Sequence, residues 1–151
     1  GKLSEADIRS LRGFRQLYVN TFTDNLLTKA KVTCALSEGK GRNVIDDNYD
    51  TSVRPKMKDG KAVFQFKLKK PATFNVLSVQ EDIRKGQRVE KFSLEVKDAK
   101  GNWKKVTEGT TVGHKRLLKF PVETAKEVRL IISEVRAVPA ISEIGLYRLR
   151  D

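Results

Sequence analysis

The first part of the chain repeats its apolar residues with the period of an α-helix. A capping box, Ser4-Glu5-Ala6-Asp7, places a hydroxyl at the helix start and an acid in the first turn. Apolar side chains then recur at spacings of three and four residues, at Ile8, Leu11, Phe14, Tyr18 and Phe22. We therefore expect an amphipathic helix that ends between residues 20 and 25, and its apolar stripe requires a partner surface.

Beyond residue 30 the pattern changes to the period of β-strands. Apolar and polar residues alternate in two segments, 62–68 and 92–96, so each is predicted to be a strand with one buried face. Further apolar segments predict the remaining strands, at 73–80, 117–120, 127–133 and 141–147. The segment 98–102 predicts a hairpin turn in which Gly101 adopts a positive φ. Short strands separated by turn residues predict an all-β antiparallel sandwich.

Composition limits the class of protein without naming it. The chain has 151 residues, enough for one domain, and its formal net charge is 31 − 19 = +12. A basic chain suggests nucleic-acid binding, but such proteins also interleave exposed aromatic residues. Here the aromatic residues fall on predicted core positions, and acids interrupt most of the basic stretches. We therefore expect a lysine-covered surface rather than a nucleic-acid site. No apolar run approaches the roughly 20 residues needed to cross a membrane.

Catalytic motifs are absent from the sequence. Cys34 and His114 are the single residues of their kinds, so neither an intrachain disulfide nor a cysteine–histidine metal site can form. Cys34 lies in an apolar run, which is typical of a buried, unreactive thiol. Two pairs of carboxylates, Glu81 with Asp82 and Asp46 with Asp50, lack supporting motif residues for glycoside hydrolysis. We expect that this chain is not an enzyme by itself.

Four segments resemble a known family. They are the loop-and-strand segment 80–92, the segment 108–116, the strand 128–132 and the C-terminal segment 137–147. Together they resemble galactose-binding-like, discoidin-type (factor V/VIII type C) domains, in particular the accessory domains on the C-terminal side of bacterial α-L-fucosidases. The resemblance implies a jelly-roll sandwich over residues 28–151. It also implies that residues 1–27 are a helical linker from a catalytic domain that this chain lacks.

The resemblance also implies a function. It predicts a non-catalytic carbohydrate-binding domain that binds a fucosylated or galactose-containing glycan and packs on the catalytic barrel of the same parent chain. The parent would be an exported bacterial α-L-fucosidase, acting outside the cell or in the periplasm. Two alternatives stay open, namely a purely structural domain without sugar binding and a basic nucleic-acid-binding module.

Candidate sugar ligands come from the loops that match the family's binding loops. Arginine is suited to this task because its rigid fork donates two hydrogen bonds to adjacent oxygens, and an aromatic ring can stack on a sugar. The candidates are Tyr49, Glu81, Arg84, Arg88, His114, Arg116 and Arg136. The alternative is that these charged residues are solvated or pair with neighbouring acids.

A candidate metal site follows from the same resemblance. Relatives carry an Asp-Gly-Asp-x-x-Thr-x-Trp loop that holds a structural Ca²⁺ with a glutamate near the C-terminus. In this chain Asp47 replaces the glycine and Val53 replaces the tryptophan. The carried-over ligands are Asp46, Asn48, Thr51 and Glu143. Their oxygen atoms suit Ca²⁺, and the alternative is a polar turn whose side chains bond their own backbone.

Overall fold

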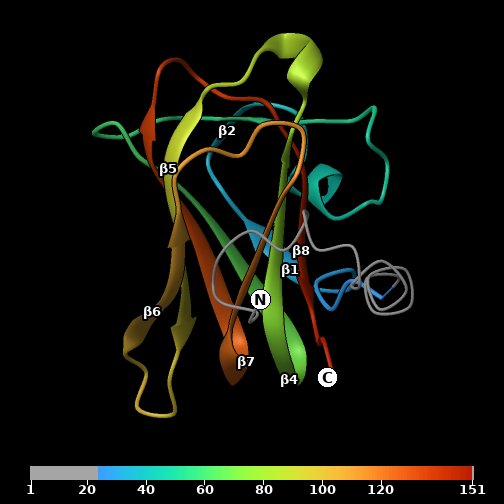
Figure 1. Cartoon of the computed structure of the whole chain (residues 1–151), viewed down its shortest axis with the longest axis vertical. Coiled ribbons are helices and arrows are strands. Elements are labelled where there is room, and N and C mark those ends of the chain that lie inside the picture. The colour runs from blue at the N-terminus through green and yellow to red at the C-terminus, as the bar shows by residue number, and fades with distance from the viewer. Residues whose placement is uncertain (1–23, 151) are drawn as a thin grey trace, which may run out of the picture.

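Antiparallel strands form a β-sandwich over residues 24–150, the part of the chain that the computed structural model describes (Figure 1). The elements are β1 (Lys31–Thr33), β2 (Leu36–Glu38), η2 (Gly41–Val44), β3 (Arg54–Pro55), β4 (Ala62–Glu81), η3 (Ile83–Lys85), β5 (Val89–Lys97), β6 (Trp103–Gly109), β7 (Arg116–Val135) and β8 (Ile141–Tyr147). The predicted fold class is confirmed, while the predicted N-terminal helix lies outside the described residues. Within residues 24–150 no helix is both long and apolar enough to cross a bilayer.

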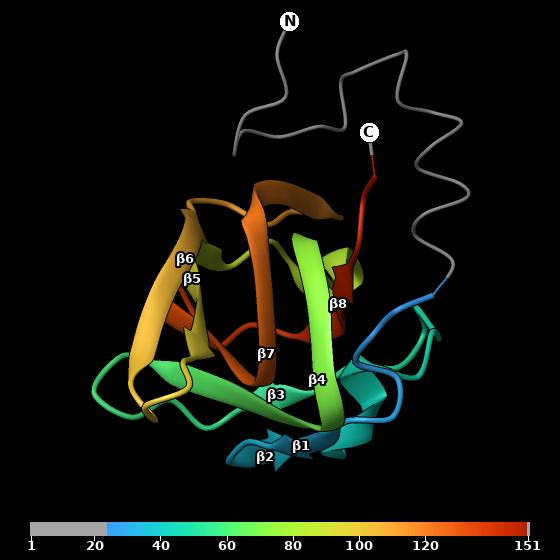
Figure 2. The ribbon, with the colours of Figure 1, turned by 90° about the horizontal axis from the view of Figure 1, so that it is seen from below.

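Two long strands, β4 and β7, connect the layers of the sandwich. The first half of β4 pairs with β1 and with the second half of β7, where Phe66 lies opposite Val128. Its second half pairs with β8 and with the first half of β7, where Leu77 lies opposite Leu118. Irregular register marks the bend between these halves. As a result β4 and β7 lie between β5 and β6 on one side and β8 on the other (Figure 2).

This continuity corrects one prediction. The sequence predicts separate strands at 62–68 and 73–80, and again at 117–120 and 127–133, but each pair belongs to one strand. The polar segment Lys69-Lys70-Pro71 interrupts the apolar pattern of β4 while the strand continues through it. The predicted hairpin between β5 and β6 is confirmed, with Asp98 N donating to Asn102 O over 2.8 Å and Gly101 at φ 84°.

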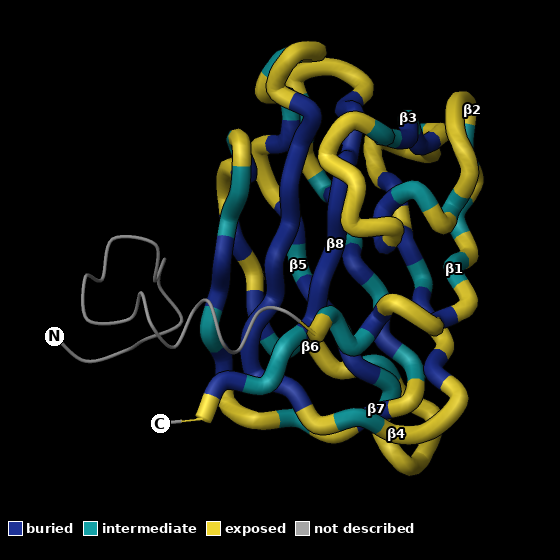
Figure 3. The backbone as a smooth tube through the Cα atoms, turned by 90° about the vertical axis from the view of Figure 1, so that its right-hand side faces the viewer, coloured by how far each residue is buried: buried dark blue, intermediate teal, exposed yellow. Residues whose placement is uncertain are grey.

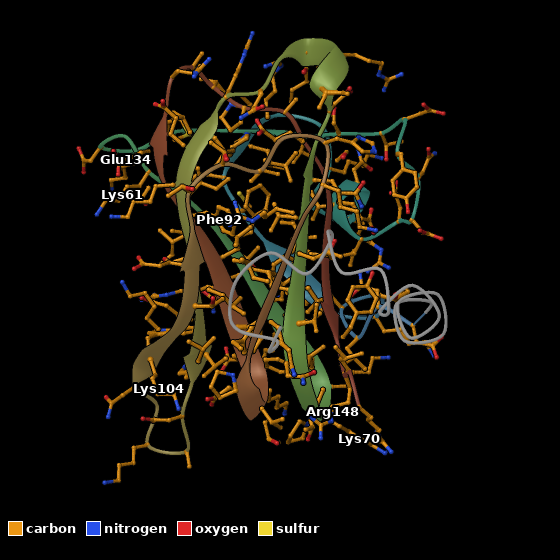
Figure 4. The ribbon with its side chains drawn as sticks, viewed as in Figure 1. Lys61, Lys70, Phe92, Lys104, Glu134 and Arg148 are labelled. Carbon is orange, nitrogen blue, oxygen red and sulfur yellow. The ribbon has the colours of Figure 1, made fainter. Side chains whose placement is uncertain are left out.

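The core is built from the predicted apolar faces. Phe64, Phe66, Phe74 and Phe92 are fully buried, and Phe92 lies inside the sandwich in Figure 4. Phe74 also meets Phe120 edge to face at 6.2 Å between ring centres. Buried residues follow the strands, and exposed residues concentrate in the loops (Figure 3). Removing one such ring would cost about 3–5 kcal/mol, so these residues hold the loops in place.

The N-terminal edge of the sandwich begins before the predicted boundary at residue 28. The Asn25 amide donates to Ile144 O over 2.9 Å, and its oxygen accepts from Leu146 N over 3.0 Å. Leu27 is buried in the core. Asn25 to Leu27 therefore pack against β8 as part of the sandwich.

The outer face of β5, β6 and β7 is covered by paired charges. Arg129 binds Glu95 over 2.6 Å, and Lys97 binds Glu127 over 3.4 Å. The guanidinium of Arg129 also lies 4.2 Å from the centre of the Trp103 ring. Trp103 thus packs on the sandwich under a cation. Much of the basic charge on this face is compensated locally.

Candidate functional site

Loops at the η3 end of the sandwich surround a hollow of about 210 Å³. Four of the predicted sugar ligands line it, namely Tyr49, Glu81, Arg84 and His114. They come from three segments far apart in the sequence, which are the loop before β3, the η3 loop and the loop before β7. The fold therefore gathers predicted residues that the sequence could only place on separate loops.

Two exposed apolar side chains give the hollow a face for the C–H groups of a ligand. Tyr49 is 55% exposed and Ile83 is 52% exposed, and both line the hollow. Ile83 is absent from the sequence prediction, although a lone apolar residue between Asp82 and Arg84 is a signal that could have identified it. Tyr49 also lines a larger neighbouring hollow of about 1010 Å³, together with Glu143.

Arg84 is held in place by a neighbouring acid. Its Nε donates to Asp82 Oδ1 over 2.9 Å, and its Nη2 donates to Asp82 Oδ2 over 3.0 Å. The same guanidinium reaches Asp50 Oδ1 over 3.4 Å. The hydrogen bond from Arg84 lowers the pKa of the buried Asp82 carboxyl, more than its burial raises it. This fork fixes the Arg84 head group, while its side chain stays 60% exposed.

Glu81 differs from its prediction as a direct sugar ligand. Its carboxylate is buried, and Oε1 accepts from the backbone N–H groups of Arg88 over 2.8 Å and Val89 over 3.1 Å. Oε2 accepts from Gly113 N over 3.3 Å. Burial raises the pKa of Glu81 despite these three hydrogen bonds. Glu81 therefore ties the η3 loop to the loop before β7 and acts as a positioning residue.

The other three predicted sugar ligands lie outside the hollow. Arg88 donates to Val138 O over 2.8 Å, and Arg116 donates to Thr111 O over 2.9 Å. Arg136 lies 3.9 Å from Glu90, and its backbone N–H donates to Arg88 O over 2.9 Å. Arg88 and Arg116 thus brace the surrounding loops through backbone carbonyls, while Arg136 pairs with an acid, as the alternative interpretation of the sequence predicts.

The predicted metal loop is a series of turns held by hydrogen bonds between its own residues. Asp46 Oδ2 accepts from the Thr51 hydroxyl over 2.7 Å, and the same hydroxyl lies 2.9 Å from Asn48 O. Asp46 Oδ1 accepts from Asn48 N, while Asn48 Oδ1 accepts from Asp50 N. These last two bonds are the polar-turn arrangement, so the loop is folded by its own side chains.

Glu143 supplies the observation that favours a cation. Its carboxyl is buried on β8, where Oε2 accepts from Asp47 N over 3.3 Å. Its Oε1 is buried without a hydrogen-bond partner among the described residues. Burial, and then the nearby charges of Asp46 and Asp47, raise the pKa of Glu143 to about 8. A hard cation would neutralise these acids and satisfy the orphaned oxygen.

The donor set therefore fits Ca²⁺ better than a transition metal. Within positions 24–150 no group of three or more His, Cys, Asp or Glu residues is arranged to hold a metal ion. Any cation here would also need the Thr51 hydroxyl and backbone carbonyls such as Asn48 O. Such neutral oxygen ligands are typical of Ca²⁺.

Comparison with known proteins identifies the family. The sequence profile described as the F5/8 type C domain matches residues 28–144 of the chain. The chain belongs to the F5/8 type C domain family. The resemblance predicted from the four sequence segments is thus confirmed, together with the sandwich fold.

The relatives of this F5/8 type C domain include α-L-fucosidases. It is 36% identical to Alpha-L-fucosidase 1 of Arabidopsis thaliana, over 97% of the domain and 31% of the relative. A putative α-L-fucosidase from Bacteroides thetaiotaomicron superposes with a TM-score of 0.82 and 31% identity, over 89% of the domain and 31% of that chain. The domain thus spans about a third of the length of these relatives. It corresponds to a small, non-catalytic part of fucosidase-like proteins.

A third similarity concerns the fold alone. Chitosan-binding module 2 from a Paenibacillus sp. IK-5 chitosanase/glucanase, solved with chitotriose, superposes with a TM-score of 0.71 at 17% identity. The superposition covers 82% of this chain and 99% of that module.

The two departures from the family's loop have structural explanations. Asp47, at the family's glycine position, adopts φ 55°, a left-handed conformation that glycine adopts without strain. Val53, at the tryptophan position, is fully buried and exchanges two backbone hydrogen bonds of 2.9 Å with Ile141. In this F5/8 type C domain Asp47 thus has a backbone conformation that glycine favours, and Val53 contributes to the core rather than to the hollow.

Proposed function

We propose that this domain binds a neutral glycan, fucosylated or galactose-containing, in the 210 Å³ hollow as the accessory domain of a larger α-L-fucosidase. The observation that carries the proposal is the convergence of Tyr49, Ile83, Arg84 and His114 on that hollow. Binding would hold the parent enzyme close to its substrate, while the sandwich packs on the catalytic barrel. The parent is proposed to be exported, and the bacterial source stays a prediction, since relatives occur in both a plant and a bacterium.

The chemistry of the hollow suits a sugar. The Tyr49 ring and the Ile83 side chain offer an apolar surface for the C–H face of a pyranose. The remaining Nη1 N–H of Arg84 and the His114 imidazole offer hydrogen bonds to sugar hydroxyls. Because Asp82 already fixes the Arg84 head group, little side-chain entropy would be lost on binding.

A structural calcium ion is part of the proposal. The residues that would hold it are Asp46, Thr51 and Glu143, with Asn48 contributing its backbone carbonyl. The ion would supply positive charge between acids that otherwise repel one another. Tyr49 lies within the same loop, so holding this loop also holds one wall of the hollow.

The second candidate function is a purely structural domain. A specific observation favours it, because Arg84 already bonds Asp82 and Asp50, and the hollow has one exposed aromatic ring among its lining residues. Under this alternative the loops would serve only to pack against the rest of the parent protein.

A glycan array followed by titration calorimetry of the best ligand separates the two candidates. We expect Tyr49→Ala and Arg84→Ala each to weaken binding about tenfold, because each removes about 1–2 kcal/mol of contact. The matched controls are Tyr147→Phe, in the neighbouring larger hollow, and Arg136→Ala, a loop arginine outside the 210 Å³ hollow. The absence of any neutral glycan ligand on the array, or equal losses in the controls, would favour the structural domain.

A further inference from the structure

A groove of about 470 Å³ opens at the other end of the sandwich from η3. The bulge of β7 at Phe120-Pro121-Val122 forms one wall, and the C-terminal segment 148–150 forms the other. In Figure 4 Arg148 lies at the lower end of the molecule, while the yellow-green η3 helix lies at the top of Figure 1. The groove is therefore remote from the hollow that carries the proposed function.

Asn75 holds the C-terminal wall of this groove in place. Its side-chain amide donates to Leu149 O over 3.0 Å, and its oxygen accepts from Leu149 N over 2.7 Å. Both Asn75 and Leu149 are buried. This two-point attachment fixes the backbone of the segment, so the residues on either side of Leu149, Arg148 and Arg150, start from a fixed position on the groove wall.

These two arginines differ from every other arginine among residues 24–150. Each of the others donates a side-chain hydrogen bond or forms an ion pair, namely Arg42, Arg54, Arg84, Arg88, Arg116, Arg129 and Arg136. Neither Arg148 nor Arg150 makes such an interaction with a described residue. No acidic residue is among the described residues that line the groove, and Lys119 adds a third cation to it.

We propose that this groove is a second binding site, in which Arg148 and Arg150 bind the acid group of an anionic glycan. The arginine fork matches the two oxygens of a carboxylate or sulfate group. Beside the arginines, Val122 is 49% exposed and lines the groove with Pro121. The groove thus offers positive charge for the acid group and an apolar surface for the sugar ring that carries it.

The lining favours a glycan over a nucleic acid. Single-stranded nucleic acids bind by stacking their bases on exposed aromatic rings. Among the described lining residues the one aromatic side chain is Phe120, which is buried and meets Phe74 edge to face. The groove therefore suits a sugar ring that carries an acid group and needs no aromatic side chain to stack on. Uronic acids and sulfated sugars have this chemistry.

Titration calorimetry of the full 151-residue chain tests the proposal with three probes of matched length. An oligogalacturonate carries carboxylates, a heparin fragment carries sulfates as well, and a chito-oligosaccharide with all its amines acetylated is neutral. We expect at least one acidic probe to bind, and the comparison of the first two identifies whether carboxylate or sulfate is preferred. The double variant R148Q/R150Q should weaken that binding about tenfold or more, while thermal melting checks that it is folded.

A matched control separates this site from general attraction to a basic protein. The variant K58Q/K100Q removes the same charge from two exposed loop lysines outside the groove, and should change affinity by less than about twofold. The proposal is overturned if neither acidic probe binds or if the control loses as much affinity as R148Q/R150Q. It is also overturned if a DNA oligonucleotide or polyglutamate peptide of matched charge binds the groove more tightly. Arg84→Ala should leave acidic-glycan binding unchanged, so failure here is distinguishable from failure at the η3 end.

Discussion

At the η3 end the Arg84 guanidinium donates hydrogen bonds to both carboxylate oxygens of Asp82. At the opposite end Arg148 and Arg150 have no side-chain partner among the described residues. Both carboxylate oxygens of Glu81 likewise accept hydrogen bonds from backbone N–H groups. Acidic partners therefore fix the shape of the small hollow in which Arg84 is proposed to bind a neutral glycan, whereas Arg148 and Arg150 are proposed to bind through groups that no described residue holds. The comparison teaches that the same residue type serves architecture or recognition according to its partners, so net charge alone locates neither site.

The largest test of the architectural role is Glu81→Ala. Removing the carboxylate leaves the buried N–H of Val89 and the half-buried N–H groups of Arg88 and Gly113 without an acceptor, which we expect to lower the free energy of unfolding by about 3 kcal/mol. Urea denaturation measures this loss, and Glu81→Gln should recover part of it. The exposed Glu90→Ala is the control and should have little effect. A stable Glu81→Ala protein would mean that this carboxylate does not hold the loops.

Calcium removal is expected to have the next largest effect. At a free calcium concentration of about one hundred times Kd, binding would raise the free energy of unfolding by about 2.7 kcal/mol. Thermal melting with calcium and with a chelator measures the difference, which Glu143→Gln should reduce sharply. The pKa of Glu143 also predicts a pH dependence for the chelated protein. Because this pKa is raised to about 8 in the folded state, the free energy of unfolding should fall as pH rises toward 8. Identical melting with and without calcium would contradict the site.

At the opposite end, Asn75→Ala should cost about 2 kcal/mol of stability. The change leaves the buried N–H and C=O groups of Leu149 without their partner. The same change should also weaken binding of the acidic probe, because the backbone that carries Arg148 and Arg150 is released. Denaturation and calorimetry on one preparation measure both effects. Loss of stability with unchanged affinity would show that fixing this segment does not matter for binding.

A smaller effect is expected from Asp82→Asn. The pKa of Asp82 is lowered in the folded protein, so its ion pair stabilises the fold at pH values above its ordinary pKa of 3.8. This stabilisation is lost as pH falls through the pKa of the folded state. The variant should therefore be less stable than the parent near neutral pH, with a shallower decline on acidification. Parallel acid-denaturation profiles of the two proteins make the comparison. Superimposable profiles would show that the Asp82 ion pair does not stabilise the fold.

The smallest predicted change is a gain. Asp47→Gly should raise the free energy of unfolding by about 0.5–1 kcal/mol, since glycine adopts φ 55° without the strain of a side chain. It also removes one negative charge near Glu143. Urea denaturation of chelated protein measures the gain, with Asp59→Gly, at φ 54°, as a comparison outside the metal loop. A loss of stability at position 47 would indicate that the Asp47 side chain is needed there.

Much of the fold was predictable because alternation reports burial directly. Phe64, Phe66 and Phe92 lie in the core where the period of two places them. The continuity of β4 was not predictable, since Lys69, Lys70 and Pro71 interrupt the apolar pattern without ending the strand.

The sites divided in a similar way. The family resemblance predicted Tyr49, Arg84 and His114 as sugar ligands on separate loops, and the structure places them around one hollow. Arg148 and Arg150 were missed because sequence cannot report which of 31 basic residues lack an acidic partner in space. That property depends on pairing between segments distant in the chain.

One measurement tests the division between the two ends most directly. Backbone amide shifts of the labelled protein are followed by NMR while the best neutral glycan, and separately the best acidic glycan, is added. The neutral glycan is predicted to shift the amides of Tyr49, Arg84 and His114, and the acidic glycan those of Val122, Arg148 and Arg150. Shifts from both ligands at a single end, or no shift around the 210 Å³ hollow with any neutral glycan, would contradict the account.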